Sequence, residues 1–134
     1  MASFLTAEDR HTIRADIRNP ATASKLIRGA IGDEALDITM TGTLTMTKNT
    51  HFTHRILRLD PAGAARQANL PTEASMKGYL GLIVNAADAA EAITFKEDAG
   101  STTIATVDQS EAVLLACDGT SWWGIIVTAT SIAG

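Results

Sequence analysis

A series of short apolar runs closed by turn residues constrains the fold of this chain more than any other feature. Each run is long enough for a strand and too short for a typical globular helix, and Asn, Asp, Gly and Ser cluster between the runs. Regular spacing of such runs is typical of antiparallel β structure. The runs occupy residues 78–84, 92–96, 102–107, 111–116 and 122–128. We therefore expect a mainly β protein, a small antiparallel β-sandwich or barrel-like domain of about seven strands.

Upstream of these runs, residues 36–47 alternate between apolar and polar side chains. Gly42 interrupts the apolar series, and five of the polar positions are threonine. Period two over this length predicts either one half-buried strand or two strands bent at Gly42. The threonine row is either a partner-facing ladder or a solvated strand face, for which threonine is well suited. Residues 51–59 are expected to form a further strand, and residues 64–74 an irregular segment.

The first 35 residues follow a different pattern. Thr6 can cap a helix that runs to about Arg18, and Asn19-Pro20 begins a second helix over residues 21–31. Both helices are short and weakly apolar, so neither can bury a core of its own. The sequence predicts an N-terminal helical arm over residues 1–35, followed by a β domain over residues 36–134.

Composition and charge narrow the possible partners. Hydrophobic residues make up 46% of the chain but aromatic residues only 4%, so an aliphatic core is expected. Such a core is thin for a sandwich and favours an oligomer whose subunits share it. The net charge of −4 argues against a nucleic-acid partner. We expect neither a membrane span nor a signal peptide, and therefore a product made in a cytoplasm.

No arrangement of residues indicates catalysis or metal binding. The serines lack a Gly-x-Ser-x-Gly motif, and the single Cys117 is expected to be a small core residue. His51 and His54 lie three residues apart on a predicted strand, which points them to opposite faces. We therefore expect a non-enzymatic protein with no cofactor.

Trp122 and Trp123 are adjacent on a predicted strand. Neighbouring strand residues point to opposite faces, so one ring is expected in the core and the other on the surface. The exposed ring can contact a neighbouring subunit or stack on a sugar.

The order of these segments resembles tailed-bacteriophage virion proteins, namely capsid decoration proteins and head-fibre or tail-fibre modules. The resemblance spans about residues 66 to 127 and is carried by Leu70-Pro71, residues 78–85, Ile93-Thr94, residues 103–106 and residues 118–122. It implies a capsid decoration (cement) protein that binds and stabilises the major capsid protein shell, as a homotrimer on the virion capsid surface, assembled in the host cytoplasm. The alternative is a carbohydrate- or receptor-binding fibre-tip module. The chain has no long repetitive shaft sequence, which favours decoration.

Two groups of residues are assigned to contacts under this interpretation. The arm residues expected to contact the capsid are Phe4, Leu5, Arg10, Ile13, Arg14, Ile17 and Arg18. The residues expected at the oligomer interface are Leu36, Ile38, Met40, Leu44, Met46, and one of Trp122 and Trp123.

Overall fold

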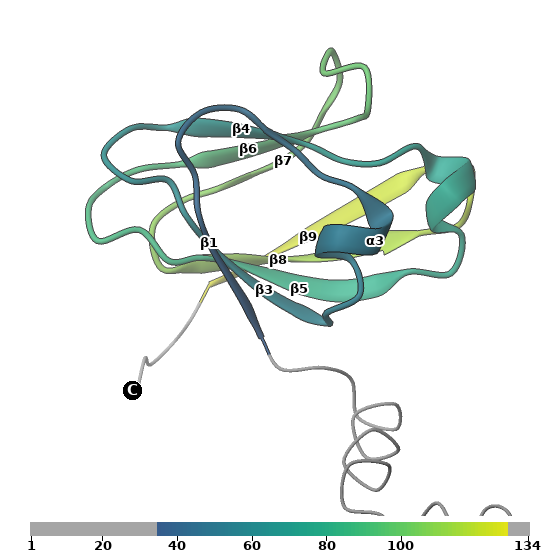
Figure 1. The fold of residues 1–134 in the computed structure, drawn as a ribbon, viewed down its shortest axis with the longest axis horizontal. Helices are drawn as coiled ribbons and strands as arrows, with labels where there is room; N and C mark the ends of the chain where they lie inside the picture. The colour runs from purple at the N-terminus through teal and green to yellow at the C-terminus, as the bar shows by residue number, and fades with distance from the viewer. Residues whose placement is uncertain (1–34, 129–134) are drawn as a thin grey trace, which may run out of the picture. The chain divides into compact units, whose positions relative to one another are not determined.

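Two β-sheets lie face to face in the part of the chain that the structure describes (Figure 1). The structure is a computed structural model, and it describes residues 35–128. The five-stranded sheet has the order β1 (Leu36–Thr39), β3 (Ile56–Asp60), β5 (Leu80–Asn85), β8 (Glu111–Cys117) and β9 (Trp122–Thr128). The four-stranded sheet has the order β2 (Leu44–Thr45), β4 (Arg66–Asn69), β6 (Ile93–Lys96) and β7 (Thr103–Val107). The described residues also form two single-turn helices, α3 (Lys48–His51) and the 3-10 helix η1 (Glu73–Met76).

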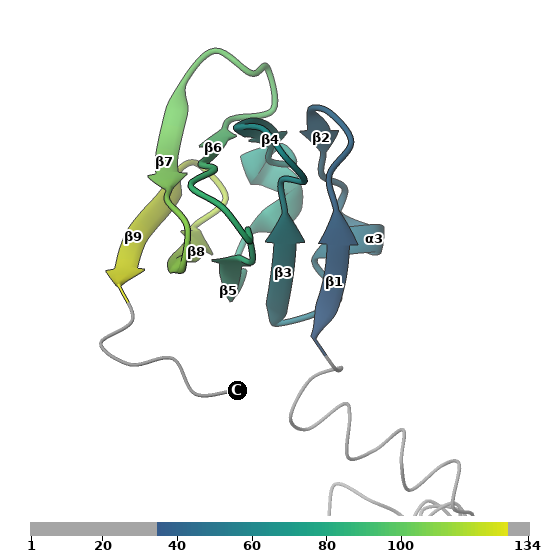
Figure 2. The same cartoon turned by 90° about the vertical axis from the view of Figure 1, so that its left-hand side faces the viewer.

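From β1 to β6 the chain alternates between the two sheets. Each time the chain returns to a sheet, the new strand lies beside the previous strand of that sheet and runs in the same direction. The strands β1, β3 and β5 therefore pair in parallel, as do β2, β4 and β6. The chain then reverses, and β7, β8 and β9 join by antiparallel pairing. Figure 2 shows the strands of both sheets side by side in this order.

The prediction of a mainly β domain is confirmed, but two details of it are wrong. Nine strands are present among residues 35–128 rather than about seven, and four of the seven strand pairings are parallel. Parallel pairing arises because most turns lead the chain into the opposite sheet, whereas a hairpin would return it beside the strand just completed.

Individual segments also refine the sequence-based boundaries. The alternating residues 36–47 form two strands, because the chain bends at Gly42 and passes from one sheet to the other. The expected strand over residues 51–59 begins only at Ile56, since His51 ends α3. The segment 64–74, expected to be irregular, contains β4.

The core lies between the sheets and is mainly aliphatic, as expected. Its fully buried side chains include Leu57, Leu59, Ile83, Leu115, Ile93, Phe95 and Val107. Cys117 is buried among them, which confirms its expected place. The outward-facing residues Thr39, Thr41, Thr43 and Thr45 are exposed, as both interpretations of the threonine row require.

This core corrects part of the expected oligomer interface. Met40 and Met46 are each 2% exposed and belong to the chain's own core, while Leu36, Ile38 and Leu44 are half-buried against it. The two methionines are buried because their strand ends bring them between the sheets, where Met40 N–H donates to Asp60 O and Met46 N–H to Asn69 O. These two side chains are not available to a second subunit.

The predicted helical arm and its seven proposed capsid contacts fall within residues 1–34, outside the described residues. Those assignments stay predictions.

Candidate interaction surface

The outer face of the five-stranded sheet carries an uninterrupted apolar surface across β3, β5, β8 and β9. We call it the apolar face and define it by Ile56, Leu80, Leu82, Val84, Ala112, Leu114, Ala116, Trp123, Ile125 and Val127. These residues alternate along their strands with the inward-facing core residues, such as Leu57, Ile83 and Val113. Alternation of side chains along a strand therefore gives this sheet two apolar faces, of which the core covers only one.

Strand register aligns the apolar face into three rows that cross the sheet. The central row runs from β3 to β9 as Ile56, Leu82, Leu114 and Ile125. The row on one side contains Leu80, Ala116 and Trp123. The row on the other side contains Val84, Ala112 and Val127. Cross-strand neighbours of this kind are the contacts that hold a sheet together, and here they are uncharged throughout.

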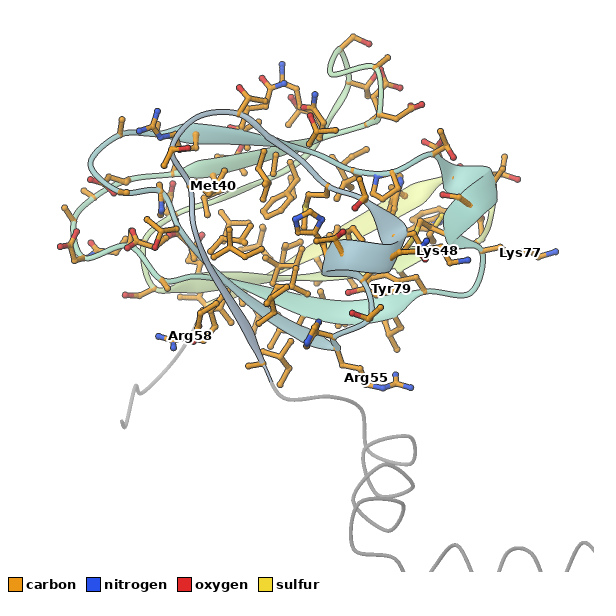
Figure 3. All side chains as sticks on the ribbon, viewed as in Figure 1. Met40, Lys48, Arg55, Arg58, Lys77 and Tyr79 are labelled. Carbon is orange, nitrogen blue, oxygen red and sulfur yellow. The ribbon has the colours of Figure 1, made fainter. Side chains whose placement is uncertain are left out.

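Charge appears only at the margin of this surface. Arg58 extends the third row on β3, beside Asp37 of β1, and its Nη1 lies 3.1 Å from the Asp37 carboxylate. Figure 3 shows Arg55 and Arg58 pointing away from the core on the outer side of β3. The Arg58–Asp37 pair therefore lies at the β1–β3 end, and at the start of β9 the Asp118 carboxylate lies beside the Trp123 side chain.

The strand β9 is the most exposed part of the apolar face. It is the edge strand of its sheet, and 61% of Trp123 and 62% of Ile125 are exposed. On its inner side, Gly124 lets the strand approach the four-stranded sheet, because a Cβ there would lie 3.2 Å from the Ala105 Cβ. The inner side of β9 is thus closely packed at Gly124, whereas its outer side presents large uncovered side chains.

The exposed area is large for a domain of this size. From their exposed fractions, Ile56, Leu80, Trp123, Ile125 and Val127 offer on the order of 500 Å² of apolar surface. This is at the upper end of the range for the largest patch of a typical monomer, where such patches commonly mark binding sites.

The two tryptophans point to opposite faces, as the sequence predicts. Trp122 is 7% exposed, its Nε1–H donates to Pro71 O at 3.0 Å, and its ring lies 6.0 and 6.1 Å from those of Phe52 and Tyr79. Trp122 is therefore a core residue, which removes it from the expected oligomer interface. Trp123 is the outward ring.

Tyr79 is the described residue with the most strongly shifted pKa. Burial raises the pKa of its phenol to about 12, and the nearby Arg55 opposes this only in part. Among the described residues, no group forms a hydrogen bond with its buried hydroxyl. A phenol held neutral in this way is a packing group, and its high pKa makes it unsuited to act as a general base near neutral pH.

The histidines are engaged locally. His51 is buried in α3, where its Nδ1 accepts a hydrogen bond from Thr47 N–H at 2.9 Å, and His54 Nδ1 lies 3.0 Å from Thr53 Oγ1. The expected placement of both residues on one strand was wrong, because His51 ends α3 and His54 precedes β3, which begins at Ile56. Within residues 35–128, no three His, Cys, Asp or Glu side chains lie close enough together to hold a metal ion.

The outer face of the four-stranded sheet has the opposite character. It is polar, with Gln67, Thr94 and Thr106 aligned across three strands, and a shallow depression on it is also lined by Lys96. The domain therefore presents one polar and one apolar sheet face.

Sequence reasoning predicted that one of Trp122 and Trp123 is exposed, without deciding which, and missed the rest of the apolar face. The signal was present in residues 122–127, Trp-Trp-Gly-Ile-Ile-Val, which have no polar residue at either alternate position. A strand with one solvated face alternates with polar residues, so an unbroken apolar run indicates that both faces are to be covered.

Within the described part of the chain, no helix has the length and apolar character needed to cross a membrane. No family model, curated protein or solved structure matches the chain.

Proposed function

We propose that this protein is a non-enzymatic structural subunit, a capsid decoration protein that binds and stabilises a shell of the major capsid protein. The observation that carries the proposal is the apolar face, which ends on the edge strand β9. The resemblance of residues 66 to 127 to phage virion proteins supplies the kind of assembly.

The apolar face can supply much of the free energy that joins one subunit to another. Covering about 500 Å² of apolar surface is worth on the order of 10 kcal/mol. That is comparable to the whole free energy of unfolding of a small domain. A chain that leaves so much burial unused gains it when it joins an assembly.

The two parts of the chain divide the contacts under this proposal. The apolar face joins one subunit to another, in the homotrimer that the resemblance implies. The arm contacts the shell through the residues assigned to it, which include Ile13, Arg14, Ile17 and Arg18. Because many copies bind one lattice, each arm contact can be weak and the shell is still decorated.

The test is binding of the full chain to undecorated shells of a tailed-bacteriophage major capsid protein. We expect the protein to co-sediment with the shells to saturation and to raise their resistance to heat. The variant Ile13→Asp/Ile17→Asp is expected to bind at least tenfold more weakly, while Thr106→Lys, on the polar sheet face, binds as the wild type does. Absence of the wild-type protein from sedimented shells, or equal binding by the arm variant, would contradict the proposal.

The second candidate function is a carbohydrate- or receptor-binding fibre tip, and exposed Trp123 is the observation in its favour. Its register neighbours on the apolar face are aliphatic, Ala116 across the strand pair and Ile125 two residues along. Sugar sites combine an aromatic platform with polar groups that bind hydroxyls. The Asp118 carboxylate lies beside Trp123, but it already accepts hydrogen bonds from Thr120 N–H and Ser121 N–H. Glycan-array binding that is lost in Trp123→Ala would favour this function over decoration.

A further inference from the structure

We propose that a second copy of this chain covers the apolar face, with β9 at the centre of the contact. The second copy thus contacts the apolar face, and residues 36–46, where the sequence placed the oligomer interface, lie outside this contact. It rests on the subunit contact assigned under the proposed function, but it concerns the protein in solution, so a monomeric chain that still binds shells would contradict this inference alone.

The side chains of the apolar face differ in size between neighbouring strands. On β9, more than three-fifths of Trp123 and of Ile125 is exposed. On β8, the residues paired with Trp123 and Val127 are Ala116 and Ala112, whose side chains are much smaller. Two copies that meet through this face can interdigitate large and small side chains, as packed sheets do. Such a contact closes either as a two-fold dimer or as a three-fold ring.

Charge also favours a second copy. The whole chain carries a net charge of −4, so copies that meet through charged surfaces repel one another. The ten residues of the apolar face carry no charge, and the rim residues Arg58 and Asp37 neutralise each other at 3.1 Å. An uncharged, largely aliphatic surface is typical of interfaces between identical subunits, whereas interfaces with transient partners are more polar.

The available area approaches that of a standard protein interface. The five most exposed side chains offer on the order of 500 Å², and the half-buried Leu82, Val84, Leu114 and Ala116 add to it. A standard protein interface buries about 800 Å² on each partner. One copy of the apolar face thus approaches the area that a single symmetric contact needs.

The position of β9 gives a further reason for covering it. It is an edge strand with exposed apolar side chains on both sides, since Ile126, on the side opposite Ile125, is 39% exposed. Natural proteins protect edges with charges, prolines or cover, because a bare apolar edge pairs with other chains indiscriminately. From Trp122 to Thr128 there is no charged residue and no proline. A face-to-face contact with a second copy covers the exposed apolar side chains Trp123, Ile125 and Val127 of this strand.

The test is the solution mass of the full chain and of two matched variants, measured by light scattering after size exclusion. Ile125→Lys places a charge at the centre of the apolar face. Thr106→Lys places the same charge on the exposed polar face of β7. We expect the wild type and Thr106→Lys to have two or three times the chain mass of 14.1 kDa, and Ile125→Lys to dissociate with an affinity weakened on the order of 100-fold.

Two results would overturn the inference: a wild-type protein with the mass of one chain at high concentration, or Ile125→Lys with the mass of the wild type. Folding is checked by the fluorescence of buried Trp122, which changes when the domain opens and the ring leaves the core. If Ile125→Lys fails to fold by this criterion, Leu80→Lys tests the same face from β5, where 53% of the residue is exposed.

Discussion

Replacing Asn85 by alanine is expected to lower the free energy of unfolding by about 3 kcal/mol, because this side chain ties the two sheets together. Asn85 ends β5 and is 2% exposed. Its Nδ2 donates to the carbonyl oxygens of Glu91 at 2.7 Å and Val107 at 2.9 Å, and its Oδ1 accepts from Ala87 N–H at 3.0 Å. One amide thus fixes the end of β5, the following turn and the end of β7.

The magnitude follows from these three contacts. Each hydrogen bond contributes about 1 kcal/mol net, and a buried carbonyl left without a partner costs more. The bond to Val107 is buried, so its carbonyl has the least access to water in the variant. For a domain of about 100 residues, a loss of this size lowers the Tm by roughly 10–20 °C.

Urea unfolding of the full chain, followed by tryptophan fluorescence, measures the loss. Asn85→Asp has the same size but brings a carboxylate against two carbonyl oxygens, and we expect it to be at least as destabilising as Asn85→Ala at pH 7. Gln109→Ala is the control, since its exposed Nε2 donates to Ala87 O at 3.3 Å, and a loss below about 0.5 kcal/mol is expected. Equal losses for Asn85→Ala and Gln109→Ala would refute the reasoning.

Three further predictions concern Tyr79, Gly81 and Asp118. The buried Tyr79 hydroxyl forms no hydrogen bond with any described residue. The variant Tyr79→Phe is therefore expected to raise the free energy of unfolding by about 1 kcal/mol. An unchanged or lower urea midpoint would argue against this. Tyr79 is the only tyrosine, so phenolate absorbance should show half-ionisation near pH 12, and a midpoint near pH 10 would contradict its burial. A Cβ at Gly81 would collide with the Tyr79 hydroxyl and lie 3.0 Å from Arg55 O. The variant Gly81→Ala is therefore expected to lower the free energy of unfolding by ~1–3 kcal/mol, measured by thermal unfolding. A stability equal to that of the wild type would show that the Tyr79 ring moves aside freely. Backbone N–H groups of Thr120 and Ser121 lower the pKa of Asp118 below its ordinary value, so the stabilisation by its carboxylate is present above the ordinary pKa and is lost as pH falls through the lowered one. The difference in free energy of unfolding between the wild type and Asp118→Asn should therefore narrow as the solution is acidified through this range, and a constant difference would count against it.

The parts of the fold that depend on local patterns were predictable from the sequence. The strand β9 begins and ends at the expected residues, and β6, β7 and β8 differ by one residue at one end. The turn before β9 was also predictable, because Asp118 accepts from two backbone N–H groups and Gly119 has a φ of +94°. Local chemistry determines a turn of this kind completely.

Long-range pairing was not predictable in the same way. A turn such as Asp60-Pro61-Ala62-Gly63 reverses the chain, but its residues do not determine which sheet the next strand joins. Strand β4, Arg-Gln-Ala-Asn, has little β propensity and contributes only Ala68 to the core. It is a strand because β2 and β6 pair with it on both sides, which is a tertiary effect.

The apolar face also depends on long-range pairing that the sequence does not determine. An apolar residue at an alternating position was expected to point either to the core or to a partner, and sequence alone does not separate the two. Met40 and Met46 were assigned to an interface and lie in the core, whereas Ile125 and Val127 lie outside it. Only the register between β8 and β9 reveals which side of the sheet each residue occupies.

The most direct test of the assembly proposal is the rate at which a thiol reagent labels Ile125→Cys in the full chain. Cys117 is buried and contributes little to the labelling. If other copies cover the apolar face, Cys at position 125 reacts many-fold more slowly than Cys at position 106 in Thr106→Cys, and its rate rises on dilution. Equal labelling rates at the two positions at every protein concentration would show that the apolar face is open to solvent and would contradict the account.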